Sequence, residues 1–261
     1  MAEQQAVCPL CQDAGWIFIE KDGLSAAKRC SCASSVKQNA PEDLEARANI
    51  PLKFASASFD TFSLPADNPV AHKALTDVML KVRRYCTDFP FHLKRPGLML
   101  IGNPGCGKTH LAVAVLRRLI ERGHRCLFVD YSKLIESIKK GFDPVEGGAH
   151  REAYREALEA DVLLLDDLGA HRAQEYLEDA LTAIFSHRSN NNLPTIVTTN
   201  EYDPDAGDVI RYKELETGHS RLRVTLEERI GIRARSRLFE MCTIINMRSL
   251  ADFRTKNNRI L

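Results

Sequence analysis

The sequence predicts an α/β fold in which helices flank a five-stranded parallel sheet. Its main support is a set of short apolar runs, each continuous enough for a strand buried on both faces, at residues 98–101, 126–129, 162–165, 194–200 and 242–247. Segments with helical spacing of apolar residues separate these runs, and strands that alternate with helices form a doubly wound parallel sheet. The chain of 261 residues is long enough for one such domain and a small additional module.

Composition and charge narrow the class of protein. Every apolar run is far shorter than the roughly 18 to 20 residues that span a bilayer, and residues 1–7 lack the basic and then apolar layout of a secretory signal. We therefore expect a cytoplasmic protein with no membrane partner. The formal net charge of +1 neither supports nor excludes a nucleic-acid partner, so such a contact would come from a local basic cluster.

The most specific motif is Gly102-Asn103-Pro104-Gly105-Cys106-Gly107-Lys108-Thr109, which matches G-x-x-x-x-G-K-[ST] in full. It lies between an apolar run and a helical pattern, which is the context that a nucleotide-phosphate loop requires. In such a loop the backbone N–H groups surround an anion, Lys108 reaches the outer phosphates and Thr109 holds Mg²⁺. We assign these residues and the adjoining His110 to nucleotide binding. The alternative is a glycine-rich turn that binds nothing.

Two carboxylates, Asp166 and Asp167, directly follow the run 162–165. This places them at the carboxyl end of a strand, where open α/β sheets bind ligands. We expect Asp166 to share Mg²⁺ with Thr109, and Asp167 to orient or polarise an attacking water. The alternative is a pair that caps the next helix. Asn200 ends the following strand and is expected to bind the terminal phosphate or the water, although Asn at such a position is otherwise a turn former.

The first 32 residues hold four of the eight cysteines, in the spacing C-x₂-C and then C-x-C. Four thiolates suit a closed tetrahedral Zn²⁺ site, so we predict zinc binding, with free surface cysteines as the alternative. The expected ligands are Cys8, Cys11, Cys30 and Cys32. A closed site has no open position for a substrate, which indicates a structural or partner-binding role. The expected organisation is a zinc-ribbon-like module at 1–34, a linker at 35–56 and a nucleotide-binding domain at 57–261.

Three further segments matter for the expected function. Residues 133–140 carry three lysines, which form either a solvated helix face or a nucleic-acid contact. Residues 203–223 form a long polar excursion, and residues 226–239 form an arginine-rich helix. Because the chain ends soon after the last apolar run, we expect no helical lid domain at the C-terminus.

Taken together, the phosphate loop, Leu163-Leu164-Leu165-Asp166-Asp167-Leu168-Gly169, Thr198-Thr199-Asn200 and Ser236-Arg237-Leu238 resemble the AAA+ ATPases of the DnaC/DnaI/IstB group. These are bacterial and phage helicase loaders and transposition helpers. The resemblance covers about residues 51–254. It implies that 102–109 is the Walker A loop, Asp166 and Asp167 are the Walker B pair, Asn200 is sensor 1, and Arg237 is the arginine finger. Arg233, on the same helix face, is the other candidate for the arginine finger. The alternative is that this helix is only a solvent-exposed charged helix and supplies no finger.

The resemblance also implies a function. A loader of this kind binds ATP and Mg²⁺, self-associates in an ATP-dependent ring or spiral, and delivers a hexameric replicative helicase to single-stranded DNA. The cysteine-rich N-terminus, with its expected Zn²⁺, favours a loader over the same-fold alternative, a transposase-stimulating ATPase of the IstB type. Asp167 stands where AAA+ enzymes generally have Glu, and its shorter side chain predicts slow hydrolysis. A second alternative is a zinc-dependent adaptor that binds nucleotide without hydrolysing it.

Overall fold

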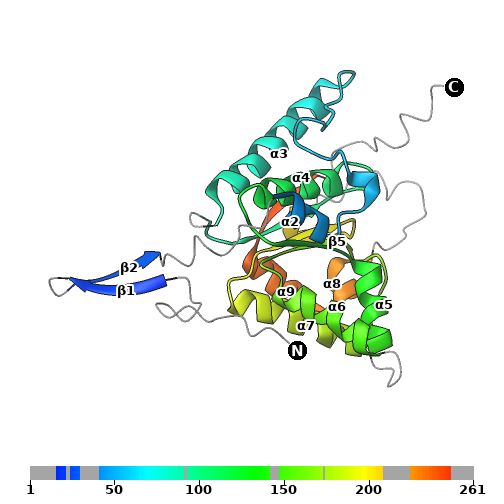
Figure 1. The fold of residues 1–261 in the computed structure, drawn as a ribbon. Coiled ribbons are helices and arrows are strands. Elements are labelled where there is room, and N and C mark those ends of the chain that lie inside the picture. The colour runs from blue at the N-terminus through cyan, green and yellow to red at the C-terminus, as the bar shows by residue number, and fades with distance from the viewer. Residues whose placement is uncertain are drawn as a thin grey trace.

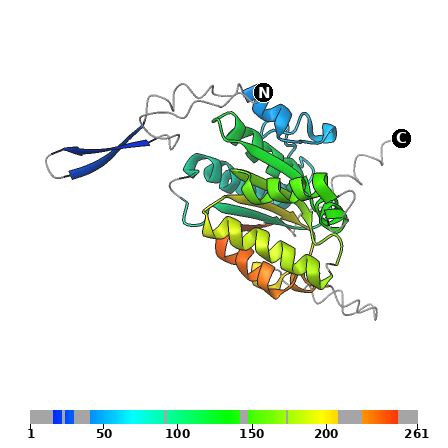
Figure 2. The same ribbon diagram turned by 60° about the horizontal axis from the view of Figure 1, so that its bottom comes forward.

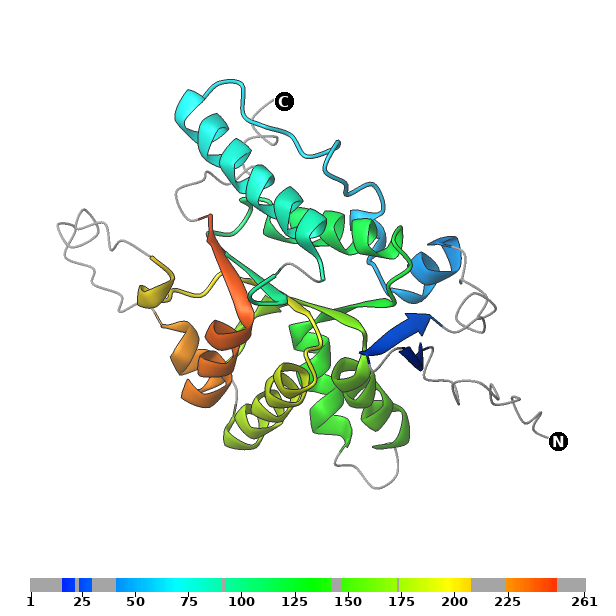
Figure 3. The same ribbon diagram turned by 90° about the vertical axis from the view of Figure 1, so that its left-hand side faces the viewer.

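A computed structural model describes residues 16–21, 24–29, 41–90, 93–141, 147–172, 174–207 and 224–247. Within this part of the chain a parallel sheet lies between two layers of helices (Figure 1). Figure 3 shows the same three layers from the side, with the sheet in the middle. The predicted α/β fold with a five-stranded parallel sheet is therefore confirmed.

The sheet consists of β3 (Gly97–Ile101), β4 (Cys126–Asp130), β5 (Val162–Leu168), β6 (Thr195–Thr199) and β7 (Cys242–Asn246), in the spatial order β4-β5-β6-β3-β7 with all pairs parallel. Its three inner strands, β3, β5 and β6, are almost completely buried because helices cover both faces. Side chains alternate between the faces, so that Leu98 and Leu100 join one apolar cluster and Met99 joins the other. The order brings β6 between β3 and β5, and the carboxyl ends of these three strands meet at one edge.

One face of the sheet carries α2 (Pro41–Arg47), the short helix η1 (Leu52–Phe54), α3 (Pro69–Asp88) and α4 (Lys108–Ile120). The other face carries α5 (Tyr131–Gly141), α6 (Gly147–Glu159), α7 (Glu175–Asn190), α8 (Leu226–Ile230) and α9 (Ile232–Met241). A further short helix, η2 (Pro204–Ala206), follows β6. Figure 2 shows α7 and α9 side by side on their face of the sheet, where they pack together.

Part of the expected linker packs against the nucleotide-binding domain. In α2, Leu44 is buried in the same cluster as α3 and α4, and Pro41 is the first helical residue, where its missing N–H costs nothing. The carbonyl of Ala48 accepts a hydrogen bond from the N–H of Phe128 in β4 (2.7 Å). Residues 41–56 therefore lie on the folded domain, although the sequence expectation placed them in a linker.

The arginine-rich segment forms two helices, where the sequence predicted one. Gly231 separates α8 from α9 and has a φ of +85°, a conformation that a helix interior does not allow. Thr225 caps α8 through a capping box with Glu228. The break lets α9 take its own direction along α7.

Arg188, at the end of α7, is fully buried and holds three elements together. Its guanidinium donates to the carbonyls of Ala160 (2.8 Å) and Pro194 (2.7 Å) and to the hydroxyl of Thr195 (2.9 Å). Burial lowers the pKa of Arg188 to about 10. This side chain therefore fastens the segment after α6 and the start of β6 to α7.

A separate antiparallel hairpin, β1 (Trp16–Lys21) and β2 (Leu24–Arg29), lies between the two cysteine pairs in the sequence. Its strands lie within residues 1–34, where the sequence predicted a zinc-ribbon-like module. The expected zinc ligands Cys8, Cys11, Cys30 and Cys32 lie outside the described residues. No helix in the described part of the chain has the length and apolar character that crossing a bilayer requires.

Candidate nucleotide-binding site

The phosphate loop connects β3 to α4, as the motif requires. Gly107 is the residue before α4 and has a φ of +94°, which strongly favours glycine. A Cβ atom at this position would lie 2.6 Å from Cε2 of Phe62, which packs directly on the loop. Conformation and space therefore both demand glycine here. The loop N–H groups at the start of α4 add the positive end of a helix to the site.

Lys108 is buried and its ammonium is held by oxygen atoms. It donates to the carbonyls of Gly102 (3.0 Å) and Asn103 (2.8 Å) and to the side-chain oxygen Oδ1 of Asn200 (2.6 Å). These contacts place a positive charge beside the loop, between β3 and β6. Phosphate oxygens can replace these acceptors, because a lysine ammonium accommodates any arrangement of three acceptors.

Asp166 and Thr109 meet across the site. Oδ1 of Asp166 accepts hydrogen bonds from the hydroxyls of Thr109 (2.8 Å) and Thr198 (2.6 Å). Burial raises the pKa of Asp166, while these two hydrogen bonds oppose the shift. A hydroxyl and a carboxylate held side by side in this way are hard oxygen ligands of the kind that Mg²⁺ prefers.

Asp167 lies in a different environment from its neighbour. Its φ of +58° is uncommon for a residue with a side chain, and it falls where the pairing of β5 and β6 shifts register between Leu165 and Leu168. The backbone N–H of Asp167 donates to Thr198 Oγ1 (2.9 Å), and its carboxylate accepts a hydrogen bond from the amide of Asn200. The irregular backbone thus turns the two adjacent carboxylates toward different partners.

These residues surround a pocket of about 300 Å³. Its lining comprises Lys53, Phe54, Pro104, Gly105, Gly107, Lys108, Thr109, His110, Asp130, Asp166, Asp167, Thr198 and Asn200. The glycine cradle, the lysine and the pair Thr109 and Asp166 fit a nucleotide phosphate with Mg²⁺: the loop and Lys108 would hold the phosphates, and Thr109 and Asp166 the metal.

The structure thus gathers most of the predicted site residues in one place. Of the loop residues outside the pocket lining, Gly102 and Asn103 contribute carbonyls to Lys108, and Cys106 is buried behind the loop. Sequence reasoning missed the role of Thr198. Its signal was a hydroxyl side chain near the carboxyl end of a fully buried strand, two residues before Asn200. Asp130, at the end of β4, and Lys53 were also missed as pocket residues.

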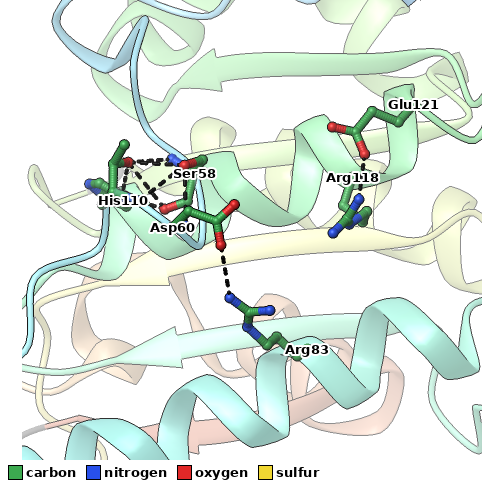
Figure 4. Close-up of polar contacts among 7 residues, drawn as sticks. Ser58, Asp60, Arg83, His110, Arg118 and Glu121 are labelled. Carbon is green, nitrogen blue, oxygen red and sulfur yellow. Dashed lines mark hydrogen bonds and ion pairs between the residues drawn. The ribbon is translucent and has the colours of Figure 1, made fainter.

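His110 connects the loop helix to the segment that leads into the domain. Its Nε2 donates to the carbonyl of Ser58 (2.8 Å) and lies 3.3 Å from the hydroxyl of Thr61. Figure 4 shows this contact together with the nearby ion pair of Asp60 with Arg83 of α3 (3.3 Å). The lead-in segment is therefore attached to α4 on one side and to α3 on the other.

No arginine of α9 is among the described residues that line this pocket. Arg237 is half-exposed and pairs with Glu240 on the same helix (2.8 Å), and Arg233 is exposed, 4.0 Å from Asp179 of α7. Arg235 differs from both, because it makes a two-point ion pair with the buried Asp203 (2.6 and 2.8 Å). Arg235 therefore fastens α9 to the segment after β6, whereas Arg237 and Arg233 face outward.

The predicted basic cluster at 133–140 lies on α5. Its lysines are exposed, and Lys140 pairs with Glu136 one turn away (2.7 Å). In the structure these lysines lie on a solvent-exposed face of α5. Of the excursion at 203–223, the structure describes η2 and Gly207, and residues 208–223 lie outside the described part.

Comparison with known proteins identifies relatives of this domain. A family model described as "IstB-like ATP binding protein" matches residues 86–208. The replicative helicase loader DnaC of Escherichia coli strain K12 is 26% identical over 124 residues, which cover 48% of this chain and 49% of that protein. The match thus spans about half the length of this curated relative.

Solved structures agree with the sequence matches. The crystal structure of the DnaC helicase loader superposes with a TM-score of 0.58 and 28% identity, covering 76% of this chain and all 100% of the other. The crystal structure of DnaI shares the fold, with a TM-score of 0.56 at 24% identity over 76% of this chain and 95% of the other.

The parallel sheet, the phosphate loop and the acidic pair at the end of β5 define a P-loop ATP-binding domain of the AAA+ class. The matches with DnaC and with the IstB-like family narrow this class. They support an AAA+ protein similar to those of the DnaC/DnaI/IstB group.

Proposed function

We propose that this protein is a slow, Mg²⁺-dependent ATPase that places a hexameric replicative helicase on single-stranded DNA. The observation that carries the proposal is the series of contacts from Lys108 through Asn200 to Asp167, beside the pair of Thr109 and Asp166. These groups correspond to phosphate binding, water positioning and metal binding. The similarity to DnaC helicase loaders supports the choice of partner.

Bound ATP supplies a phosphoanhydride bond, whose hydrolysis can drive a change of conformation. Lys108 and the loop N–H groups would bind the phosphate oxygens, while Thr109 and Asp166 would hold Mg²⁺. Asp167 would orient a water molecule and accept its proton. In the structure this carboxylate accepts from Asn200, so it has to exchange a partner before it can act. The short side chain of Asp167 and its hydrogen bond with Asn200 both support slow hydrolysis.

A second subunit would complete the site. Arg237 lies on an outward-facing part of α9, where its contact with Glu240 is solvent-exposed and therefore weak. In a head-to-tail ring or spiral it would reach the nucleotide of a neighbouring copy, where an arginine finger contributes roughly 10³ to 10⁵ in rate. Arg233 is the alternative finger, because it is also exposed on the same helix.

The N-terminal part would select the partner. We propose that Cys8, Cys11, Cys30 and Cys32 bind Zn²⁺ and that the module containing the hairpin β1 and β2 docks on the helicase. Single-stranded DNA would bind to basic side chains of the AAA+ domain when ATP is present, with lysines of α5 as candidates, and its affinity would fall steeply with salt.

Phosphate release tests the enzymatic part of this proposal. With Mg²⁺ present, the full chain should hydrolyse ATP slowly, and Lys108→Ala and Asp167→Ala should each abolish most of this activity. Arg237→Ala should lower the rate only at protein concentrations where subunits associate, and Arg233→Ala tests the alternative finger in the same assay. If Asp167→Ala leaves the single-turnover rate unchanged, the proposed role of Asp167 is wrong. Unchanged phosphate release by Lys108→Ala would point to a contaminating ATPase.

A second candidate function is stimulation of a transposase by an IstB-type ATPase, which the IstB-like family match favours. Affinity capture separates the two. The full chain, loaded with ATP and Mg²⁺, should retain a hexameric helicase, and replacing Cys8 and Cys11 with serine should abolish the capture without loss of ATP binding. Retention of a transposase in place of the helicase would support the second candidate.

A further inference from the structure

The pocket has a cation that does not belong to the phosphate loop. Lys53 and Phe54, both in η1, line the same cavity as Lys108, Thr109 and Asp166. They precede α3, and the sequence placed them in a linker before the domain. The nucleotide pocket is therefore built partly from the segment that joins the N-terminal module to the AAA+ core.

Several contacts fix the position of η1. Phe54 is partly buried and packs against the apolar cluster beneath α3 and α4. On one side, Ala48 accepts from Phe128 of β4, and on the other, Ser58 accepts from His110 of α4. The short helix is thus held to the core at both ends, as Figure 4 shows for the downstream end. The place of Lys53 is therefore set by the fold.

The aromatic ring of Phe54 supports the Lys53 ammonium, whose Nζ lies 4.9 Å from the ring centroid. Among the described residues, this ammonium makes no hydrogen bond or ion pair, and the side chain is exposed to solvent at the pocket rim. Lys108, in contrast, already donates to three oxygens. Lys53 is thus a positive charge at the pocket that is available to a ligand.

The charges around the pocket indicate which ligand. Three carboxylates, Asp130, Asp166 and Asp167, line it together with the two lysines. The segment before Lys53 is hydrogen-bonded to β4, whose last residue Asp130 is the register partner of Asp166 in β5, and all three side chains line the end of the pocket where the metal pair lies. A triphosphate keeps net negative charge even with Mg²⁺ bound, and its terminal phosphate adds to the charge at that end. Lys53, as a second cation beside Lys108, therefore stabilises bound ATP more than bound ADP.

We infer that Lys53 is a phosphate-binding residue that contacts the terminal phosphate of ATP within the same subunit and makes the site prefer ATP to ADP. This inference rests on the proposed ATP site. It also means that bound ATP touches the segment leading to the N-terminal module. Because Lys53 contacts ATP itself, its removal weakens the binding of ATP even when no hydrolysis takes place.

Equilibrium binding of a fluorescent, non-hydrolysable ATP analogue and of fluorescent ADP, both with Mg²⁺, tests the inference on the full chain. Lys53→Ala should weaken binding of the ATP analogue about tenfold, equivalent to about 1.4 kcal/mol, and change ADP binding less than about twofold. Lys53→Arg should keep most of the preference, because it retains the charge. Lys73→Ala, which removes an exposed lysine of α3 away from the pocket, is the matched control and should behave as wild type.

The outcomes separate this inference from the proposed function. If wild type binds the ATP analogue and Lys53→Ala binds it equally well or more tightly, the inference is wrong and the ATP site stands. Equal weakening for ATP analogue and ADP also overturns it, because the contact would then not be with the terminal phosphate. If wild type binds neither nucleotide, the proposed function fails and the inference with it. The melting temperature of each variant without nucleotide checks folding, and we expect no change at the exposed Lys53.

Discussion

Replacing Gly107 with alanine tests how the phosphate loop is built. Two independent features oppose a side chain here. The φ of +94° lies where residues with a Cβ are rarely found, and an added Cβ would approach Phe62 at 2.6 and 3.0 Å. Phe62 belongs to the lead-in segment and also packs edge-on against His110, with ring centroids 5.3 Å apart. The substitution therefore strains the loop and pushes on the segment that covers it.

The two costs can be separated because the chain offers a matched glycine. Gly123, after α4, has a φ of +85°, and an added Cβ would meet nothing within 4 Å among the described residues. Gly123→Ala should therefore show the backbone cost alone, about 1–2 kcal/mol. Gly107→Ala should add an overpacking cost of about 1–3 kcal/mol, for a total of about 2–5 kcal/mol. In the Gly107→Ala background, Phe62→Ala should recover the overpacking part.

Denaturant unfolding of the two single alanine variants, of Phe62→Ala and of the double variant gives these free energies. At about 2–4 °C per kcal/mol for a domain of this size, melting temperatures provide a second measure. Binding of the fluorescent ATP analogue should fall for Gly107→Ala and stay unchanged for Gly123→Ala. Equal destabilisation at Gly107 and Gly123 would refute the reasoning, because it would show that Phe62 does not press on the loop. Failure of Phe62→Ala to recover stability would refute it in the same way.

Three further predictions follow from buried polar groups. Burial raises the pKa of Asp166, so its ionisation costs stability as the pH rises above the unfolded pKa. Asp166→Asn should therefore raise the melting temperature at pH 7 without nucleotide, by an amount that shrinks toward pH 4, and should abolish stabilisation by Mg²⁺ and ATP. Arg188→Met should lower the free energy of unfolding by roughly 3 kcal/mol, because buried carbonyls lose their donor while relief of the buried charge offsets part of the loss; an unchanged value in denaturant titration would contradict this role. Asp203→Asn should lower the free energy of unfolding by about 3 kcal/mol, because it removes the charge that pairs with the partly buried Arg235. A loss below about 1 kcal/mol would show that the ion pair of Arg235 with Asp205 is enough to hold α9.

The fold class and the core of the site are predictable because their signals are local. A buried parallel strand is a continuous apolar run, and a phosphate loop is a short pattern of glycines, lysine and threonine. Asp166 and Asp167 stand directly after such a run. Each of these features is contained in fewer than about ten neighbouring residues, so the sequence alone reveals them.

Tertiary structure decides which of these groups meet and what else joins them. Lys108 and Asn200 are 92 residues apart in sequence, yet they share a hydrogen bond because β3 and β6 are neighbours in the sheet. Thr198 contacts both carboxylate residues only because the pairing of β5 and β6 shifts register beside it. No periodicity or spacing encodes such contacts.

The same holds for the segments around the site. The sequence indicated an arginine-rich helix, but only the structure shows that Gly231 divides it and that Arg235 is tied to Asp203 while Arg237 faces outward. Likewise, a lysine in an apparent linker carries no signal by itself. Lys53 belongs to the nucleotide pocket because packing of Phe54 holds it there. The sequence alone therefore determined that the protein has a phosphate site, and only the folded chain decided which distant side chains complete it, because strand order and packing are set by interactions across the whole core.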